Sequence, residues 1–227
     1  MMIEYKGHSC FRIKDFEETG YKIVLDPYKA GSVPGYKPIK EAEAELTANL
    51  ILCSHEHDDH FGIDDCTLVD EGIENPFDVD KIESYHDPEK GKLRGNNTIH
   101  ILTLRSTGEK VVHYGDVGEK LDDLLTPENL AKVEDADFAL VPIGGVYTYD
   151  FDQALELIDR TKPKVAIVMH YHSNTYNCDF EHIGSVEDFA IHAMETCHQI
   201  QMVQYTYIDT VEDTINTEII AMKPEYV

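Results

Sequence analysis

The segment Ser54–Gly62 constrains this chain more than any other, because it places three histidines and three acidic residues side by side. It directly follows an apolar run typical of a strand, and in mixed α/β folds ligands bind at the carboxyl ends of strands. In an extended turn, His55 and His57 project to the same side, so two imidazoles can meet one ion. Asp59 and His60 lie one turn further on, where they can meet a second ion.

Two neighbouring ions need about three more ligands, including an acceptor between them. Later parts of the sequence supply candidates, each directly after a strand-like apolar run, and the ends of strands in one sheet converge. These candidates are His86, Asp116 and His170.

The charge of the chain excludes one group of partners. The 227 residues include 19 Lys and Arg against 44 Asp and Glu, a net charge of −25, and no basic cluster interrupts the excess of acid. Phosphate backbones repel such a surface, so we expect neither a nucleic acid nor an anionic membrane as partner, and a small molecule as substrate.

The location of the chain is predicted to be cytoplasmic. No stretch approaches the roughly 18 apolar residues of a membrane span, and the first residues lack the apolar core of a secretory signal. The five cysteines are odd in number, widely spaced and without a CxxC pair, which argues against a disulfide framework and against a cysteine zinc site.

The order of apolar runs predicts one domain over residues 1–227, with strands first, then mixed strands and helices, arranged as two sheets with helices outside. Predicted strands are Cys10–Ile13, Tyr21–Leu25, Leu50–Cys53, Ile82–Tyr85, Thr98–Leu104, Lys110–Tyr114, Phe138–Val141, Val165–Met169, Met202–Tyr207 and Thr217–Met222. Predicted helices begin after the capping residues Thr126, Asp150 and Ser185, the last two ending near Arg160 and Cys197.

The pattern His55-x-His57-x-Asp59-His60 is the HxHxDH signature of the metallo-β-lactamase fold, and the chain resembles that family from about residue 3 to residue 172. The resemblance is closer to the small metal-dependent hydrolases that include the ascorbate-6-phosphate lactonase-like proteins, and more distant to the N-acylphosphatidylethanolamine phospholipases D. It implies an α/β (α+β) fold, a four-layer αββα sandwich of two mixed sheets flanked by helices. The matching strings are Gly7-His8-Ser9, Leu25-Asp26-Pro27, Ser54–His60, His86-Asp87, Arg94–Asn97, His113–Asp116, Pro142–Gly145 and Met169–Tyr171.

The resemblance also implies a ligand set for two divalent metal ions. His55, His57 and His86 would hold the first ion; Asp59, His60 and His170 would hold the second, with Asp116 bridging. His100 and His113 are alternatives to His86, because the segment before His100 is long and irregular. Imidazole and carboxylate ligands suit zinc, our first choice, and also manganese or iron.

Further residues receive roles around these ions. Asp26 would orient a ligand histidine through its second ring nitrogen. Asp59 and His113 are assigned catalytic roles, His113 as proton donor to the leaving group. Residues expected to contact substrate are His8, Arg94, Asn97, Tyr147 and His172, whereas Glu56 and Asp58 are expected to point outward.

These features favour a hydrolase in which a metal-bridging hydroxide cleaves an ester, a lactone or a phosphodiester of a small molecule. The alternatives are a non-catalytic metal-binding or regulatory protein and a nuclease or phosphodiesterase. A di-iron reductase of this fold typically has Glu where His57 stands, together with a flavin domain for which this chain has no room. Arg94 suggests an anionic substrate, whereas the acidic surface opposes one. Small members of this branch often form homo-oligomers, so a homo-oligomer of this chain is one expected partner arrangement.

Overall fold

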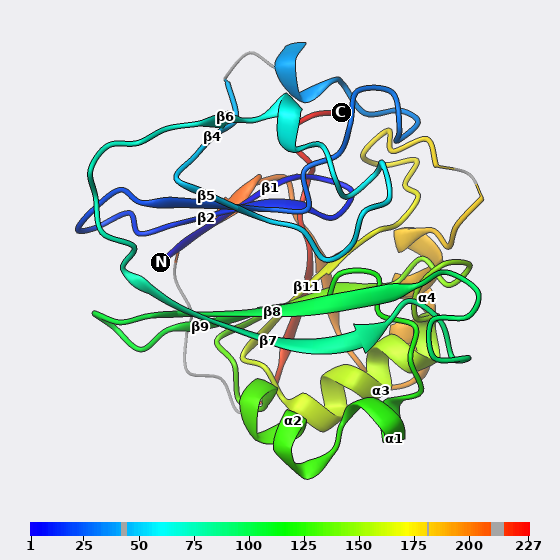
Figure 1. Cartoon of the computed structure of the whole chain (residues 1–227). Coiled ribbons are helices and arrows are strands. Elements are labelled where there is room, and N and C mark those ends of the chain that lie inside the picture. The colour runs from blue at the N-terminus through cyan, green and yellow to red at the C-terminus, as the bar shows by residue number, and fades with distance from the viewer. Residues whose placement is uncertain (42–44, 181, 210–215) are drawn as a thin grey trace.

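Two mixed β-sheets pack face to face in the computed structural model, which describes residues 1–41, 45–180, 182–209 and 216–227 (Figure 1). Phe11 of the first sheet meets the His113 ring of the second edge-on, with ring centroids 6.0 Å apart. This architecture confirms the predicted fold of two mixed sheets with helices outside.

The first sheet has five strands and is antiparallel except where β3 pairs with β5. Its order is β13-β1-β2-β3-β5, with bounds β1 (Met2–Gly7), β2 (Cys10–Lys14), β3 (Lys22–Leu25), β5 (Leu50–Leu52) and β13 (Tyr207–Ile208). The short strands β4 (Thr47–Ala48) and β6 (Thr67–Leu68) form a separate parallel pair.

The second sheet has seven strands, and its parallel centre explains the longest apolar runs of the sequence. Its order is β12-β14-β11-β10-β9-β8-β7, with bounds β7 (Phe77–Tyr85), β8 (Asn96–Leu104), β9 (Lys110–His113), β10 (Phe138–Pro142), β11 (Val165–Met169), β12 (Ile200–Met202) and β14 (Glu218–Ala221). Every residue of β10 and β11 is buried, because one face meets the other sheet and the other face meets helices.

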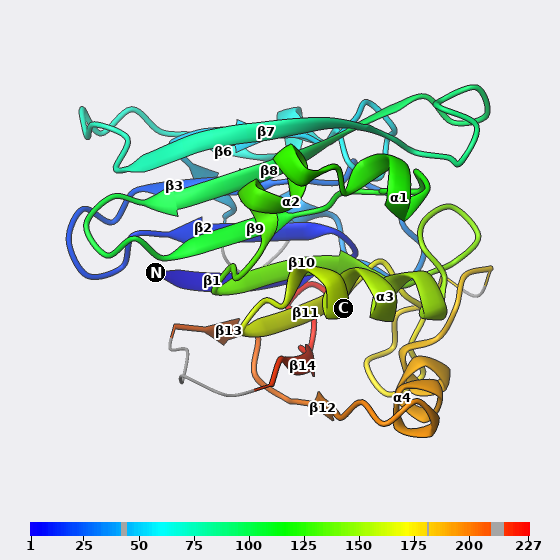
Figure 2. The same cartoon turned by 90° about the horizontal axis from the view of Figure 1, so that it is seen from below.

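Helices cover the outer face of the seven-stranded sheet, and Figure 2 shows α1, α2 and α3 lying over its strands. Their bounds are α1 (Leu121–Leu124), α2 (Pro127–Val133), α3 (Phe151–Thr161) and α4 (Val186–Glu195). Thr126, Asp150 and Ser185 are the N-caps of α2, α3 and α4, as predicted. Among the described residues, no helix combines the length and apolar character that a membrane span needs.

The outer face of the five-stranded sheet differs from the expected helical layer. Strands β4 and β6 and the 3-10 turns η1 (Ile39–Glu41) and η2 (Ile63–Asp65) lie above it in Figure 1. In the described part of the chain, all α-helices belong to the other side of the sandwich or to its edge.

One predicted strand, Met202–Tyr207, is wrong because the chain changes sheet within it. Strand β12 pairs with β14 in the seven-stranded sheet, whereas β13 pairs with β1 in the five-stranded sheet. The sequence prediction also missed β1 and the first half of β7. Four of the first five β7 residues are exposed and three of those are charged, which is typical of an edge strand. This part of β7 therefore lacks the alternation of apolar and polar residues by which a strand is predicted from sequence.

Helix α3 offers a test of how much its cap contributes to stability. Asp150 accepts a hydrogen bond from the Gln153 amide at 2.9 Å, and the Gln153 side chain accepts one from the Asp150 amide at 3.1 Å. We expect Asp150→Ala to lower the free energy of unfolding by about 1 kcal/mol in urea denaturation, and Asp150→Asn to retain most of it. Glu156→Ala on the exposed face is the control, with a change below about 0.5 kcal/mol; equal effects at both positions would contradict this role of the cap.

Candidate metal centre

Five segments that are far apart in the sequence bring polar side chains to one edge of the sandwich. The β1–β2 turn and the loop after β5 come from the five-stranded sheet, and the ends of β7, β9 and β11 come from the seven-stranded sheet. The chain therefore brings together the predicted ligands from both halves: His55, His57, Asp59, His60, His86, Asp116 and His170.

The first group of possible metal donors consists of His55, His57 and His86, whose ligand atoms lie within 4.8 Å of one another. The rings of His55 and His57 are 4.6 Å apart, and the His86 ring lies 4.8 Å from His55 and 5.1 Å from His57. These separations leave room for one ion among three imidazoles, the arrangement common in catalytic metal sites.

The second group consists of Asp59, His60 and His170, and it also contains His8. Its four ligand atoms lie within 4.8 Å of one another, and its three histidines are buried. The sequence interpretation assigned His8 to substrate contact, which is wrong because the side chain is fully buried behind Asp59 and His170.

Asp116 lies between the two groups. Its Oδ2 atom is 3.1 Å from Nε2 of His60, 3.1 Å from Nε2 of His86 and 3.3 Å from Nε2 of His170. Nε2 of His55 is 3.9 Å away. One carboxylate thus faces donors of both groups, as a bridging ligand requires.

Buried nitrogen and oxygen atoms without hydrogen-bond partners indicate that this site fits metal ions. Within the described part of the chain, Nε2 of His55, His60 and His170 and Oδ1 of Asp116 are buried without a hydrogen-bond partner. A buried polar atom that lacks a partner costs about 1–3 kcal/mol. Several such atoms converging on one space indicate that divalent ions would complete the site.

Asp26 organises the loop after β5. Its carboxylate accepts hydrogen bonds from the Ser54 amide and hydroxyl, both at 2.6 Å, and lies 2.8 Å from Nδ1 of His60. This is the geometry expected of a carboxylate that orients a ligand histidine through its second nitrogen. Ser54 Oγ in turn lies 2.9 Å from Nδ1 of His55.

Charges within the site shift several pKa values. Burial opposes the charged form of His60, but the carboxylates of Asp116 and Asp26 outweigh it and hold the pKa of His60 well above its ordinary value. Burial lowers the pKa of His55 to about 3 and that of His8 to about 4. In the metal-free protein, a proton at this site therefore resides on His60.

Asn97 supports the Asp116 loop and does not reach a substrate, so that assignment is corrected. Its side chain is fully buried, donates to Ser84 Oγ at 2.8 Å and to the Tyr114 carbonyl at 3.0 Å, and accepts from the Asp116 amide at 3.0 Å. A side chain at Gly115 would collide with Asn97 and Ser54, and φ there is +56°. Only glycine suits this position.

Three other assigned histidines lie outside the site. Nε2 of His113 bonds the Ser9 carbonyl and Nδ1 accepts from the Gly115 amide, so both nitrogens are occupied and His113 can be neither proton donor nor ligand. Nε2 of His100 lies 3.0 Å from the Cys53 carbonyl, which leaves His86 as the third histidine of the first group. His172 is not among the residues that line the adjoining cavity.

A cavity of about 450 Å³ opens onto the centre. Tyr147 and Arg94, both expected to contact substrate, line it, with the guanidinium 5.5 Å from the Tyr147 ring centre. The Arg94 guanidinium also donates to the Val146 carbonyl at 3.0 Å. Phe180, which the sequence interpretation missed, stacks on Tyr147 with ring centroids 6.4 Å apart. The described residues that line it are Ser32, His57, Asp58, Asp59, His86, Leu93, Arg94, Asp116, Tyr147 and Phe180.

Asp87 is a second residue that sequence reasoning left without a role. Its buried carboxylate accepts hydrogen bonds from the amides of Glu89, Gly91, Leu93 and Arg94 at 2.8–3.1 Å. It therefore fixes the loop that carries Arg94 beside the cavity. The available signal was an Asp-Pro pair followed by glycine, which is typical of a turn.

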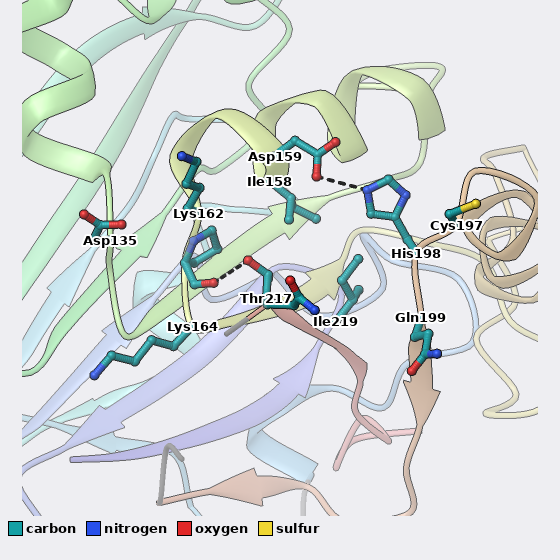
Figure 3. A pocket seen from close by; sticks show the side chains of 12 residues that line it. Asp135, Ile158, Asp159, Lys162, Lys164, Cys197, His198, Gln199, Thr217 and Ile219 are labelled. Atoms are coloured by element: carbon teal, nitrogen blue, oxygen red, sulfur yellow. Dashed lines mark hydrogen bonds and ion pairs between the residues drawn. The ribbon is translucent and has the colours of Figure 1, made fainter. Parts of the chain in front are cut away.

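A larger cavity of about 910 Å³ lies elsewhere, lined by the end of α3, the segment between α4 and β12, and the start of β14 (Figure 3). Nε2 of His198 pairs with Asp159 at 3.0 Å, and the Thr217 hydroxyl donates to the Pro163 carbonyl at 2.6 Å. No group of metal donors among the described residues involves this cavity, so the metal centre belongs to the smaller one.

Comparison with known families agrees with this geometry. A family model described as the beta-lactamase superfamily domain matches residues 2–170, which include both donor groups. The chain is 30% identical over 221 residues to a UPF0173 metal-dependent hydrolase of Carboxydothermus hydrogenoformans, covering 83% of this chain and 91% of the relative. It is 29% identical over 208 residues to the Thermoplasma acidophilum protein of that name, covering 78% and 85%.

Solved structures share the fold. A crystal structure described as a Zn-dependent hydrolase of the metallo-beta-lactamase superfamily from Thermotoga maritima superposes with a TM-score of 0.67 at 25% identity, covering 97% of both chains. A metallo hydrolase from Ignicoccus hospitalis superposes with a TM-score of 0.60 at 20% identity, covering 92% of this chain and 98% of that one.

Metal binding should release a proton from His60. A ligand imidazole must be neutral, whereas the raised pKa keeps His60 protonated near neutrality, so metal affinity should fall as pH falls from about 8 to about 6. Calorimetric titration in two buffers of different ionisation enthalpy counts the protons. Asp26→Asn removes one carboxylate that raises this pKa, so it should release fewer protons than the unaltered chain. Identical proton release in both proteins, with affinity independent of pH, would contradict the assignment.

Proposed function

This chain belongs to the UPF0173 metal-dependent hydrolase family of the metallo-β-lactamase superfamily, and we propose that it uses two divalent metal ions to hydrolyse an ester, lactone or phosphodiester bond of a small anionic molecule. The observation that carries the proposal is the convergence of two donor groups on the Asp116 carboxylate beside an open cavity. The lactonase-like branch stays a prediction, because the relatives named above are described without a substrate.

The residues of the site would hold the two ions in two groups. His55, His57 and His86 would hold one ion, Asp59, His60 and His170 would hold the other, and Asp116 would contact both. Such ions, zinc above all, acidify bound water and polarise a carbonyl or phosphoryl oxygen. The Asp59 side chain is 24% exposed and lines the cavity, so it would lie beside a bound substrate. Burial opposes its charged form, but its hydrogen bond to His8 and the neighbouring His60 hold its pKa well below the ordinary value, so it would act as a charged ligand.

Arg94 supports an anionic substrate. It is the only Lys or Arg among the described residues that line the cavity, and the Tyr147 ring and the Val146 carbonyl hold its side chain in place. A guanidinium presents two parallel donors that match a carboxylate or a phosphate. The overall charge of −25 slows the approach of an anion, but it acts at a distance and is screened by salt.

The cavity wall also supports a substrate with an apolar part. Leu93, Tyr147 and Phe180 contribute apolar surface on the same cavity that Arg94 lines. A volume of about 450 Å³ lies within the range of small-molecule sites. We therefore infer a substrate with one anionic group and an apolar or planar portion.

Hydrolysis of a substrate panel tests the proposal directly. Chelated and reconstituted protein is assayed with zinc, manganese and iron on lactones, carboxylic esters and phosphodiesters. We expect metal-dependent cleavage of one class, and a loss of at least about a thousandfold in His55→Ala together with bound metal. Asp58 pairs with Lys29 at 2.6 Å but lines the cavity, so the matched control is Glu56→Ala, an exposed residue between His55 and His57 that is not among the lining residues. Full metal loading without turnover of any class would favour the non-catalytic alternative.

The role of Arg94 predicts a selective change in KM. Arg94→Ala should raise KM for an anionic substrate about 10- to 100-fold and leave that of a neutral analogue unchanged, because a charge-assisted hydrogen bond is lost. Arg94→Lys should recover part of the effect. Arg105→Ala, which removes an exposed arginine paired with Asp78, is the control. An equal loss for anionic and neutral substrates would show that Arg94 only shapes the loop.

A further inference from the structure

We propose that His8 is a protein ligand of the second metal position, together with Asp59, His60 and His170. The position assigned to that ion would thus be closed by protein donors, while the position at His55, His57 and His86 faces the cavity. The proposal rests on the metal centre of the proposed function, although it holds whatever bond the enzyme cleaves.

The spacing of the imidazole rings carries the proposal. The His8 ring lies 4.2 Å from that of His170 and 5.4 Å from that of His60, and the His60 and His170 rings are 5.8 Å apart. The three rings of the first group are 4.6–5.1 Å apart. The chain thus builds two histidine triads of similar dimensions, one on each side of Asp116.

Donor distances agree with a shared ion. Two donors each about 2.1 Å from an ion at the tetrahedral angle are about 3.4 Å apart. Nε2 of His8 lies 3.2 Å from Oδ2 of Asp59, and that oxygen lies 3.6 Å from Nε2 of His60. A hydrogen bond between an imidazole and a carboxylate would usually be shorter when charge-assisted, at about 2.7–2.9 Å. Nδ1 of His8 is buried without a hydrogen-bond partner among the described residues, as is Nδ1 of His86 and of His170.

Burial separates the two positions. His8, His60 and His170 are at most 1% exposed, and none of them lines the cavity. His57 is exposed and lines the cavity with His86. Phe180, which lines the cavity, lies 5.8 Å from the His8 ring and 6.3 Å from the His170 ring. Asp59 is the member of the second group that lines the cavity, whereas two histidines of the first group do, so substrate would reach the first position more directly.

The backbone holds His8 in this place at a conformational cost. His8 has φ of +55° and His170 has φ of +53°, values that side chains other than glycine rarely adopt. The His8 carbonyl accepts hydrogen bonds from the Tyr5 hydroxyl at 2.9 Å and from the His170 amide at 3.0 Å. Gly7 has φ of +135° and a side chain there would collide with Tyr36. The turn is thus tied directly to the strand end that carries His170.

Cobalt titration of the metal-free protein tests the proposal without a substrate. Visible absorption and metal content should show two ions bound to the unaltered chain. His8→Ala should keep the first ion and bind the second at least about 100-fold more weakly. His8→Gln retains a hydrogen-bond donor toward Asp59 but lacks the imidazole, so it should behave like His8→Ala. His100→Gln, a histidine outside both triads, should titrate like the unaltered chain.

Two results would overturn the proposal: unchanged affinity for the second ion in both His8 variants, or full recovery in His8→Gln, which would make His8 only a hydrogen-bond donor. If the variants do not fold by circular dichroism, crystals of the zinc-loaded unaltered chain decide. A His8 nitrogen about 2.1 Å from zinc supports the ligand role, and one beyond about 3 Å excludes it. Absence of hydrolysis with His8-dependent binding would refute the proposed function alone.

Discussion

The burial of one carboxylate among imidazole nitrogens is the constraint on which the rest of this structure depends. Asp116 is 2% exposed, and its Oδ2 lies 3.1–3.9 Å from Nε2 of four histidines. Within the described residues, Nε2 of His55, His60 and His170 has no hydrogen-bond partner, so these groups stay unsatisfied without a ligand. Cations placed between them would offset the cost of burying these groups. The arrangement that destabilises the metal-free fold would therefore bind the ions on which the proposed hydrolysis depends.

The scaffold maintains this arrangement through strained but well-bonded backbone. His8, Asp26 and His170 all have positive φ, at 55°, 44° and 53°. Each such residue costs of order 1–3 kcal/mol and persists only where its surroundings fix it. Hydrogen bonds provide that restraint: the Ser54 amide and hydroxyl donate to the Asp26 carboxylate, and the His170 amide donates to the His8 carbonyl.

Residues that share a local pattern could be predicted from the sequence, whereas partners brought together by the fold could not. The HxHxDH segment, Asp116 and His170 follow apolar runs, and strand ends converge in such folds. The sequence placed both His8 and His113 in the site, and only the folded structure distinguishes them. The His8 side chain contacts Asp59, whereas the His113 side chain bonds the Ser9 carbonyl. Asn97 was misassigned because amide side chains bind backbone as readily as substrate.

The central claim is that the two donor groups hold a pair of cations on either side of Asp116. Anomalous diffraction at the zinc edge from crystals of the zinc-loaded protein measures this most directly. The account predicts two peaks about 3.5–4 Å apart, one next to His55, His57 and His86 and the other next to Asp59, His60 and His170. A single peak, or peaks that leave Asp116 without a metal contact, would contradict it.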